Sequence, residues 1–366
     1  MFWKSKEINA KKTNDATPST PNVPPIPEPN RIFTMPPEDG PHEGTWLQWP
    51  HDRAKSHWWE TGRNLVARYE KAWIDMTVAL HTGEKVHIIV YDCVHRDRVK
   101  RILQDKGCDM NQIDFFEIPT DDVWCRDNGP VFVMDENQQL HVTDWGFNGW
   151  GGKYDYKLSN EVPKCVANSI GIPITTIPMI NEGGSIEVDG RGTLMAKKSC
   201  ILNPNRNKGW KQSDAEAYFR RYLGVTNFIW LEGTRGLDIT DDHIDGTARF
   251  AHGNTIVTFF REDFEKPHEY DQLKDARDAN GEPYHLVHLP LTKRKCVNRD
   301  YGFYINYYVG NEVVLMPSFD EDPNDEVARN ILQNVYADRK VIMVPMKEVL
   351  KDGGMMHCVT QQQPKV

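Results

Sequence analysis

A loose repeat runs through the chain and restricts the folds that it can adopt. Four hairpin-turn signals, each flanked by strand-like sequence, recur at spacings of about 54 to 63 residues, close to the spacings typical of repeat architectures. They are Asp135-Glu136-Asn137, Asp189-Gly190-Arg191-Gly192, His252-Gly253-Asn254 and Val309-Gly310-Asn311. A helix candidate and then a short apolar strand follow each hairpin. The repeating unit is therefore ββαβ-like.

The helix and strand candidates of these four units follow one another in the same order each time. The helices are expected at about 159–170, 214–223, 267–279 and 323–337, and the apolar strands at 173–177, 228–231, 285–289 and 341–344. The preceding part of the chain fits the same plan, with strands at 45–49 and 86–91 and a helix at about 62–80. The sequence thus predicts an α/β fold of five related units.

The N-terminal segment differs in composition from the repeating part of the chain. Residues 1–31 are rich in Pro, Asn, Thr and Ser, so we expect a disordered tail that is polyproline-like around Pro24-Pro25-Ile26-Pro27. Order is expected to begin near Phe33, which leaves residues 32–366 as a single catalytic domain.

Composition excludes several classes of protein. The apolar runs are strand-sized, so neither a transmembrane helix nor a membrane partner is expected, and no signal-peptide segment follows Met1-Phe2-Trp3-Lys4. Seven cysteines without CxxC spacing indicate reduced thiols in a cytoplasmic protein. The net charge of −9 disfavours nucleic acid as a partner. The sequence leaves the oligomeric state open, a homo-oligomer included.

An unusual polar segment follows the last strand of several units. These segments are 121–130, 181–185, 238–245 and 352–364. Because equivalent positions of a cyclic repeat converge on one axis, we expect the segments to share a pocket. That pocket would contain a thiol, an imidazole and three carboxylates, namely Cys358, His243, Asp127, Glu182 and Asp245. If the final segment is extended, His357 points away from Cys358, so the base for the thiol has to come from another segment.

This set of side chains suits a guanidinium group. Two carboxylates can each accept a forked pair of N–H donors and so hold its carbon in place. A thiolate is nucleophilic enough to attack that poorly electrophilic carbon, and cationic charge nearby favours its formation. Each feature also has a structural alternative: a buried Cys358, an Arg126–Asp127 ion pair, a plain loop at Glu182 and a surface His243.

The ordered motifs resemble the agmatine deiminase family, one of the guanidino-modifying enzymes with the pentein fold. The likeness runs from about Met35 to Pro364. It rests on Met35-Pro36-Pro37, Trp46-Leu47-Gln48-Trp49-Pro50-His51, Trp124-Cys125-Arg126-Asp127-Asn128-Gly129-Pro130, Glu182-Gly183-Gly184, Thr240-Asp241-Asp242-His243-Ile244-Asp245 and Gly353-Gly354-Met355-Met356-His357-Cys358-Val359-Thr360-Gln361-Gln362-Gln363-Pro364.

The resemblance implies a five-bladed α/β propeller of pseudo-fivefold symmetric ββαβ units, and it implies roles for the matching residues. Cys358 would be the nucleophile and His243 the acid and base, with Glu182 orienting the histidine and the substrate. Asp127 and Asp245 would bind the guanidinium. Trp124 would flank the alkyl chain, with plain core packing as its alternative, and Asn306 comes from a segment that matches the family's Ser-Tyr-x-Asn with Phe303 in place of Ser.

The expected reaction is the hydrolysis of agmatine to N-carbamoylputrescine and ammonia, a step toward putrescine, through a covalent adduct on Cys358. No metal or other cofactor is expected. The chain departs from the family pattern at Asp242, Asp352 and Met355, where the family usually has Gly, Gly and Asn. These changes leave the expected catalytic side chains in place, so the sequence supports the type of reaction better than it identifies the substrate. Peptidyl arginine or another guanidine therefore remains an alternative substrate.

Three other functions are alternatives to guanidine hydrolysis. The run from Asp241 to Asp245 superficially resembles the Asp-x-His-x-Asp motif of manganese ureohydrolases, although no second acidic motif matches that family and Cys358 is then unexplained. A guanidine-binding protein without turnover would keep the same side chains. An amidinotransferase would need an amine acceptor in place of water.

Overall fold

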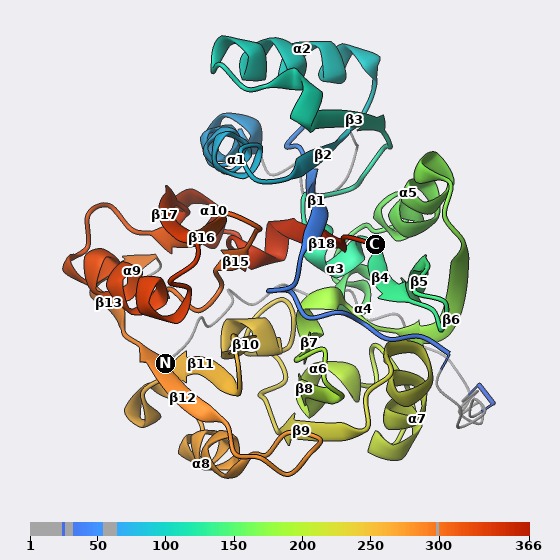
Figure 1. The fold of residues 1–366 in the computed structure, drawn as a ribbon, viewed down its shortest axis with the longest axis vertical. Coiled ribbons are helices and arrows are strands. Elements are labelled where there is room, and N and C mark those ends of the chain that lie inside the picture. Colours follow the sequence, from blue (N-terminus) through green and yellow to red (C-terminus); the bar gives the residue numbers. More distant parts are fainter. Residues whose placement is uncertain (1–23, 26–31, 54–63, 298–299) are drawn as a thin grey trace, which may run out of the picture.

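The computed structural model describes residues 24–25, 32–53, 64–297 and 300–366. In these ranges the chain forms small sheets around the middle of the molecule, with helices on their outer sides (Figure 1). The predicted disordered tail, 1–31, lies outside the described residues except for residues 24 and 25. There the Tyr218 hydroxyl donates a hydrogen bond to the carbonyl oxygen of Pro25 at 3.0 Å.

Four of the predicted units share one topology. In each, two strands form an antiparallel hairpin, and a third strand runs parallel to the second after a helical crossover. The strands, unit by unit, are β4 (Val131–Met134), β5 (Leu140–Gly146) and β6 (Ile174–Ile180); β7 (Ile186–Val188), β8 (Thr193–Lys197) and β9 (Asn227–Leu231); β10 (Ala248–Ala251), β11 (Thr255–Phe259) and β12 (His285–Leu289); and β15 (Tyr308–Val309), β16 (Val313–Ser318) and β17 (Lys340–Pro345). The crossover helices are α5 (Val162–Ile170), α7 (Gln212–Leu223), α8 (Pro267–Asp275) and α9 (Pro323–Val335). All four predicted hairpin turns are confirmed.

The remaining unit contains both the first and the last strand of the described chain. Its strands are β1 (His42–Gln48), β2 (Lys85–Val90), β3 (Ile113–Glu117) and β18 (Thr360–Pro364), and its helices are α1 (Leu65–Leu80) and α2 (Cys93–Asp105). β18 pairs antiparallel with β1, with Leu47 opposite Thr360. The indole N–H of Trp46 donates to Oε1 of Gln363 across this pair at 2.9 Å. The segment after the predicted nucleophile is therefore fixed in a sheet.

Several elements lie outside the predicted repeat. They are β3 and α2, the hairpin of β13 (Leu291–Val297) and β14 (Asp300–Phe303), and the short helices α3 (Cys125–Asn128), α4 (Gly149–Gly152), α6 (Lys198–Ile201) and α10 (Lys347–Leu350). Single 3₁₀ turns occur at Met110–Gln112, Ser159–Glu161, Gly183–Ser185, Ile244–Gly246, Arg261–Asp263 and His357–Val359. The turns at 183–185, 244–246 and 357–359 fall in the predicted polar segments.

Local signals explain where the helices begin and end. Asp92 caps α2 by accepting a hydrogen bond from the backbone N–H of His95 at 2.7 Å. α9 begins with Pro323 directly after its N-cap Asp322. α5 ends at Gly171, whose φ of 72° lies in the left-handed region that glycine adopts most easily. The crossover helices are therefore specified by nearby residues.

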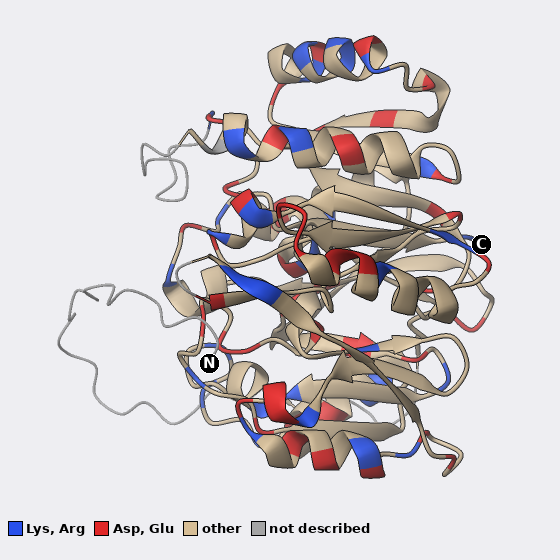
Figure 2. Ribbon diagram, turned by 90° about the vertical axis from the view of Figure 1, so that its left-hand side faces the viewer, with Lys and Arg blue, Asp and Glu red and all other residues tan. Residues whose placement is uncertain are grey.

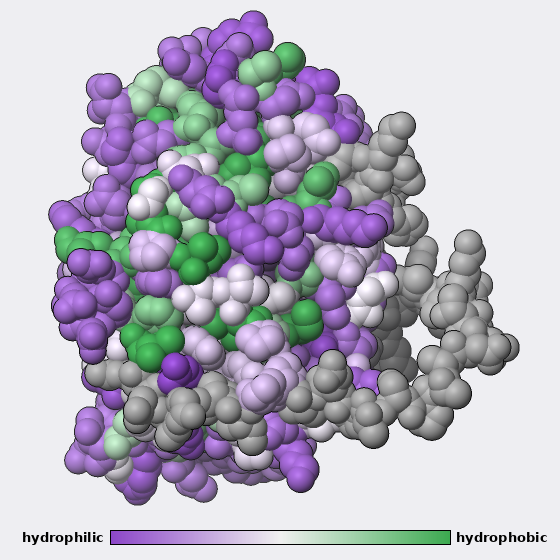
Figure 3. Space-filling view, turned by 90° about the vertical axis from the view of Figure 1, so that its right-hand side faces the viewer, coloured by the Kyte–Doolittle hydropathy of each residue, from purple (hydrophilic) through white to green (hydrophobic). Residues whose placement is uncertain are grey.

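The outer surface is mixed in character. Lysine, arginine and acidic residues are interspersed on the helices seen in Figure 2, and apolar residues form separate patches on the face in Figure 3. In the described ranges, no helix is both long and apolar enough to cross a membrane. The interior holds large buried aromatic side chains, among them Trp46, Trp49 and Trp73.

Candidate active site

Four segments from different units meet in the middle of the molecule, and each carries one or two of the predicted residues. α3 supplies Asp127, and Glu182 precedes the 3₁₀ turn at Gly183–Ser185. His243 and Asp245 belong to the turn at Ile244–Gly246, and Cys358 to the turn at His357–Val359. All four segments are short turns that follow strands, so the sheets hold each of these side chains in place.

Gly184 shows how closely these side chains approach one another. A methyl group built on its Cα would lie 2.8 Å from Oδ1 of Asp127, 2.8 Å from Nδ1 of His243 and 3.0 Å from Oδ2 of Asp245. The backbone N–H of Gly184 also donates to Oδ1 of Asp127 at 3.1 Å. Three predicted residues thus surround one glycine, and no larger side chain fits there.

His243 lies between two carboxylates. Its Nε2 is 3.2 Å from Oε2 of Glu182, and its Nδ1 is 3.6 Å from Oδ1 of Asp127. Burial alone would lower the pKa of His243, but Asp127 and Glu182 outweigh it and raise that pKa to about 9. The imidazole is therefore cationic at neutral pH and carries a proton that it can donate.

Glu182 is held by an arginine that sequence reasoning missed. Nε of Arg206 donates to Oε1 of Glu182 at 2.8 Å, and Nη1 of Arg206 donates to Oδ2 of Asp241 at 2.6 Å. Burial opposes ionisation of Glu182, but Arg206 and His243 together lower its pKa. Arg206 lies in Asn203-Pro204-Asn205-Arg206-Asn207, a turn-forming run that could have drawn attention to it.

Asp127 has a second partner that the sequence analysis did not identify. The indole N–H of Trp150 donates to Oδ2 of Asp127 at 2.8 Å. Trp150 has a φ of 54°, a left-handed conformation that is unfavourable for a bulky side chain. Burial raises the pKa of Asp127 to about 6, although His243 acts in the opposite direction. The glycines that flank Trp150 were the available signal for this turn.

Asp245 has a different environment from Asp127. Its Oδ2 lies 2.8 Å from Nδ1 of His357 and 3.8 Å from Sγ of Cys358. Burial opposes ionisation, but His357 and His243 lower the pKa of Asp245 below its ordinary value. Asp245 is therefore ionised over the whole neutral range, whereas Asp127 titrates just below it.

The expectation that assumed an extended backbone at His357 and Cys358 is wrong. His357 and Cys358 lie in a 3₁₀ turn, so both side chains approach Asp245 instead of opposite faces. Asp241 does not share a face with His243, because Asp241 and Asp242 have φ values of 64° and 76° and reverse the chain before the histidine. Asp241 instead binds Arg206 and Lys153.

The thiol of Cys358 is within reach of Asn306 and Asp245. Sγ donates to Oδ1 of Asn306 at 3.4 Å. Burial, and then the negative charges of Asp245 and Asp127, raise the pKa of Cys358 above the ordinary value of 9. In the free protein the sulfur is therefore a thiol, and a cation placed between the two aspartates would favour the thiolate.

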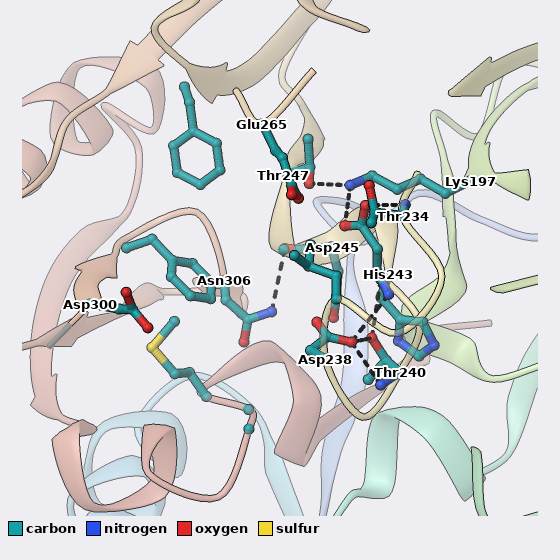
Figure 4. A pocket seen from close by; sticks show the side chains of 18 of the residues that line it. Lys197, Thr234, Asp238, Thr240, His243, Asp245, Thr247, Glu265, Asp300 and Asn306 are labelled. Carbon is teal, nitrogen blue, oxygen red and sulfur yellow. Dashed lines mark hydrogen bonds and ion pairs between the residues drawn. The ribbon is translucent and has the colours of Figure 1, made fainter. Parts of the chain in front are cut away.

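Asn306 also positions the backbone that carries the thiol. Its Oδ1 accepts hydrogen bonds from the backbone N–H groups of His357 at 3.0 Å and of Cys358 at 3.4 Å. Its Nδ2 donates to the carbonyl oxygen of Asp245 at 3.3 Å. Figure 4 shows Asn306 pointing toward Asp245 along the pocket wall.

Two hollows reach Cys358. The larger one, shown in Figure 4, has about 1070 Å³ of empty space including its open mouth, and His243, Asp245 and Asn306 line it. Acidic and aromatic side chains also line it, among them Asp238, Glu265, Asp300, Phe259, Phe264 and Phe303, together with Lys197 and Lys266. The smaller one has about 270 Å³ of such space. Its walls include Trp124, Asp127, Trp150, Ile239 and Asp352.

Trp124 packs closely against the glycine segment that leads to the thiol. A methyl group on Gly354 would lie 2.4 Å from Cζ3 of the Trp124 ring. Gly354 therefore allows the indole to close one side of the smaller hollow, where Trp124 was expected to flank the alkyl chain of the substrate.

The departures from the family pattern have identifiable surroundings. Asp242 forms a buried ion pair with Lys197, whose Nζ also donates to Oγ1 of Thr247 at 2.6 Å. Asp352 accepts a hydrogen bond from the Tyr69 hydroxyl at 2.6 Å and lies 3.0 Å from Nη2 of Arg68. Met355 is fully buried in the wall of the larger hollow.

The donor set does not support the Asp-x-His-x-Asp metal motif. Asp241 is paired with two cations, as described above, and is not directed at the same point as His243. Over the part of the chain that the structure describes, no three His, Cys, Asp or Glu side chains form a group that could hold a metal ion.

Comparison with known proteins gives a consistent result. Residues 34–364 match the family model of the Porphyromonas-type peptidyl-arginine deiminases. The agmatine deiminase of Pseudomonas aeruginosa strain LESB58 is 32% identical over 364 residues, covering 91% of this chain and 95% of its own. That of Ectopseudomonas mendocina is 32% identical over 365 residues with the same coverage. A solved structure of a C. jejuni agmatine deiminase Cys-to-Ser variant with substrate bound superposes with a TM-score of 0.77 at 27% identity, covering 91% of this chain and 97% of that one.

Proposed function

Since this chain belongs to the Porphyromonas-type peptidyl-arginine deiminase family, we propose that it hydrolyses agmatine to N-carbamoylputrescine and ammonia. It is a hydrolase that acts on C–N bonds of linear amidines, like the agmatine deiminases that it resembles over nine-tenths of its length. Agmatine carries a guanidinium group and a distal amine, and both are cations that suit a site with an acidic wall.

The observation that carries the proposal is the arrangement around Gly184. Asp127, His243 and Asp245 all approach that glycine, and Cys358 lies 3.8 Å from Asp245. A flat guanidinium bound between Asp127 and Asp245 would donate N–H hydrogen bonds to both carboxylates. Its carbon would then lie near the sulfur. Positioning of this kind can supply several kcal/mol of the catalytic effect.

The first half of the proposed reaction forms a covalent adduct. Binding of the guanidinium lowers the pKa of the Cys358 thiol, which releases its proton to solvent. The thiolate then adds to the guanidinium carbon, the C–N bond breaks, and His243 gives its proton to the departing ammonia. The adduct is an amidino-thioether cation, whose positive charge Asp127 and Asp245 continue to stabilise.

The second half uses the imidazole as a base. His243, now neutral, takes a proton from water, and the resulting hydroxide attacks the same carbon. The C–S bond breaks and the sulfur leaves as thiolate, while the hydroxyl on the carbon loses its proton as the ureido C=O forms; that proton restores the Cys358 thiol, and His243 has regained its own. Glu182 keeps the imidazole oriented throughout, because it is itself held by Arg206.

The architecture supports a more specific description of the fold. It is a pentein fold, and we propose that the five sheets with a parallel strand pair are the blades of a propeller with pseudo-fivefold symmetry, within one catalytic domain over residues 32–366. Seven free cysteines support a cytoplasmic location.

A second substrate class has its own supporting observation. The larger hollow, which Cys358, Asp238, Glu265 and Asp300 all line, has about 1070 Å³ of empty space including its open mouth, so it has room for a guanidine with a bulkier substituent than agmatine. Peptidyl arginine is the alternative that we keep, as the family model's name suggests.

The deciding experiment measures ammonia release from agmatine, free arginine and an arginine-containing peptide. Cys358→Ser and His243→Ala are tested beside the parent protein. Ammonia release from one guanidine, abolished in both variants, supports the proposal. Turnover that persists in Cys358→Ser would rule out the covalent route, and tight binding without ammonia release would indicate a guanidine-binding protein.

A further inference from the structure

His357 precedes the proposed nucleophile and lies between two carboxylates. Its Nδ1 is 2.8 Å from Oδ2 of Asp245, and its Nε2 is 2.7 Å from Oε2 of Glu38. The His357 side chain is 1% exposed and that of Asp245 is 3% exposed, so water does not compete for these bonds. Both ring nitrogens can donate to carboxylates at once only if both carry hydrogen, and the ring is then an imidazolium.

Glu38 is itself fixed by several distant segments. Its Oε2 lies 3.1 Å from Nη2 of Arg126, and its Oε1 lies 2.8 Å from Nη2 of Arg249. The backbone N–H of Val309 donates to Oε1 at 3.1 Å. Burial opposes ionisation of Glu38, but Arg249, His357 and Arg126 lower its pKa well below the ordinary value. The Glu38 carboxylate is thus a fixed negative charge in the middle of the fold.

We infer that Glu38 and His357 are positioning residues, which hold the Asp245 carboxylate ionised and directed toward a bound guanidinium. The inference rests on the proposed function, because it assigns a role within the same site. His357 acts through Asp245 and does not itself touch the substrate. We call the three residues the Glu38–His357–Asp245 chain.

The two guanidinium-binding aspartates differ in a way that this chain explains. Asp127 receives neutral donors, the Trp150 indole and the Gly184 amide, whereas Asp245 receives the His357 imidazolium. One aspartate is therefore ionised before the substrate arrives, and the other becomes fully ionised when the cation binds. Asp127 also faces the His243 imidazolium, but at 3.6 Å, so its charge is less fully compensated than that of Asp245.

Other charges also face these groups. The charges of His243, Arg249 and Asp127 act on Asp245, and the neutral Cys358 thiol also lies near it. Glu187 lies 3.9 Å from Nε2 of His357, too far for a hydrogen bond, and forms an ion pair with Arg249. Removal of the His357 charge leaves only His243 and Arg249 among the described cations that lower the pKa of Asp245, so that pKa should rise.

The same residue links the orientation of Asp245 to that of the nucleophile. The backbone N–H of His357 donates to Oδ1 of Asn306 at 3.0 Å, and that oxygen also accepts the Cys358 thiol at 3.4 Å. Displacement of the His357 ring would therefore disturb both sides of the space in which the guanidinium carbon has to lie.

The test is a pH profile of kcat/KM for His357→Asn, whose amide can still donate one hydrogen bond to Asp245 but carries no charge. We expect KM to rise about ten- to a hundredfold, the range for loss of a charged hydrogen bond, with a smaller change in kcat. The acid limb should move to higher pH and become steeper, because two aspartates now titrate there. Glu38→Gln should move the limb in the same direction.

The matched control is Glu187→Gln, which removes a buried carboxylate that lies 3.9 Å from Nε2 of His357 and makes no hydrogen bond to it. It should leave the acid limb in place even if it lowers stability. An acid limb and KM unchanged in folded His357→Asn, or the same shift in Glu187→Gln, would overturn the inference.

A binding measurement separates this inference from the proposed function. The dissociation constant of agmatine is measured by calorimetry in Cys358→Ser, with and without His357→Asn. We expect about ten- to a hundredfold weaker binding in the double variant. Equal affinities would reject the role of His357, whether or not the parent protein releases ammonia; absence of ammonia release by the parent would reject the proposed function alone.

Discussion

Trp150 donates its indole N–H to Asp127 at 2.8 Å from a backbone with a φ of 54°. Because a left-handed conformation costs a large side chain on the order of 1–3 kcal/mol, the fold accepts local strain at the point where an aspartate needs a donor. The unfavourable backbone conformation of Trp150 accompanies the placement of its indole N–H against Asp127.

Replacement of Trp150 by Phe keeps the ring and removes the donor. Burial already raises the pKa of Asp127 to about 6, and the indole hydrogen bond holds it down, so that pKa should rise further. The acid limb of kcat/KM should move to higher pH, and kcat/KM at pH 7 should fall about tenfold. The control is Trp145→Phe, since the Trp145 indole donates to Thr143 outside the site; the same loss in that variant would contradict the assignment.

The sequence predicts much of this fold because turn chemistry is local. In the turn at Asp189-Gly190-Arg191-Gly192, the Asp189 carboxylate accepts hydrogen bonds from the backbone N–H groups of Arg191 and Thr193. Such contacts involve neighbouring residues only, so the sequence predicts them. The hairpin of β13 and β14 was missed because Lys293, Arg294 and Lys295 are exposed, so no apolar alternation marks the strand.

The site was predicted less completely than the fold. The types of side chain that a guanidinium requires can be deduced from the polar segments, but their partners depend on contacts between distant parts of the chain. Glu38 and His357 are 319 residues apart, and Arg206 reaches Glu182 from a different turn. No periodicity or spacing encodes such pairs.

The pH dependence of kcat/KM should be bell-shaped. In the proposed mechanism Asp127 binds the guanidinium only when ionised, so activity should fall as the pH drops through about 6. His243 donates its proton only when protonated, so activity should fall as the pH rises through about 9. The charge of Glu182 raises both pKa values. Glu182→Gln should therefore move both limbs to lower pH, and limbs that stay in place would argue against the proposed pairing.

Binding of a cation should expel the Cys358 proton. Burial, Asp245 and Asp127 raise the pKa of this thiol above 9, so at pH 8 it is protonated until a positive charge arrives. Calorimetric titration with acetamidinium, in buffers of different ionisation enthalpy, should detect release of about one proton. Cys358→Ser should release none. Equal release by both proteins would mean that the thiolate already exists in the free enzyme or forms later.

Gly184 should not tolerate a methyl group. In Gly184→Ala the new carbon would be within 3.0 Å of Asp127, His243 and Asp245, so the three side chains have to separate. We expect kcat/KM to fall at least a hundredfold, because displacement by about 1 Å has effects of that size. Gly246→Ala is the control, since its methyl group would have no heavy atom within 4 Å. Comparable losses in both variants would point to general backbone sensitivity.

Asp242 and Lys197 should behave as a unit. Asp242→Gly relieves a left-handed aspartate but leaves the Lys197 ammonium buried without its main partner, and the second effect, about 3–5 kcal/mol, exceeds the first. Denaturant unfolding should show a net destabilisation of about 2 kcal/mol. Lys197→Met combined with Asp242→Gly should recover most of it, and additive losses would show that the pair is not coupled.

The pairing of β18 with β1 makes the position of the proposed nucleophile, Cys358, depend on a contact between opposite ends of the described chain. β18 begins two residues after Cys358 and is held along its length by the first strand of the fold, from Leu47 to His42. Peeling this one strand away would carry the sulfur out of reach of three carboxylates and an imidazole that stay assembled on other sheets. Loss of this one buried strand would therefore inactivate the enzyme even if the other sheets kept their pairing.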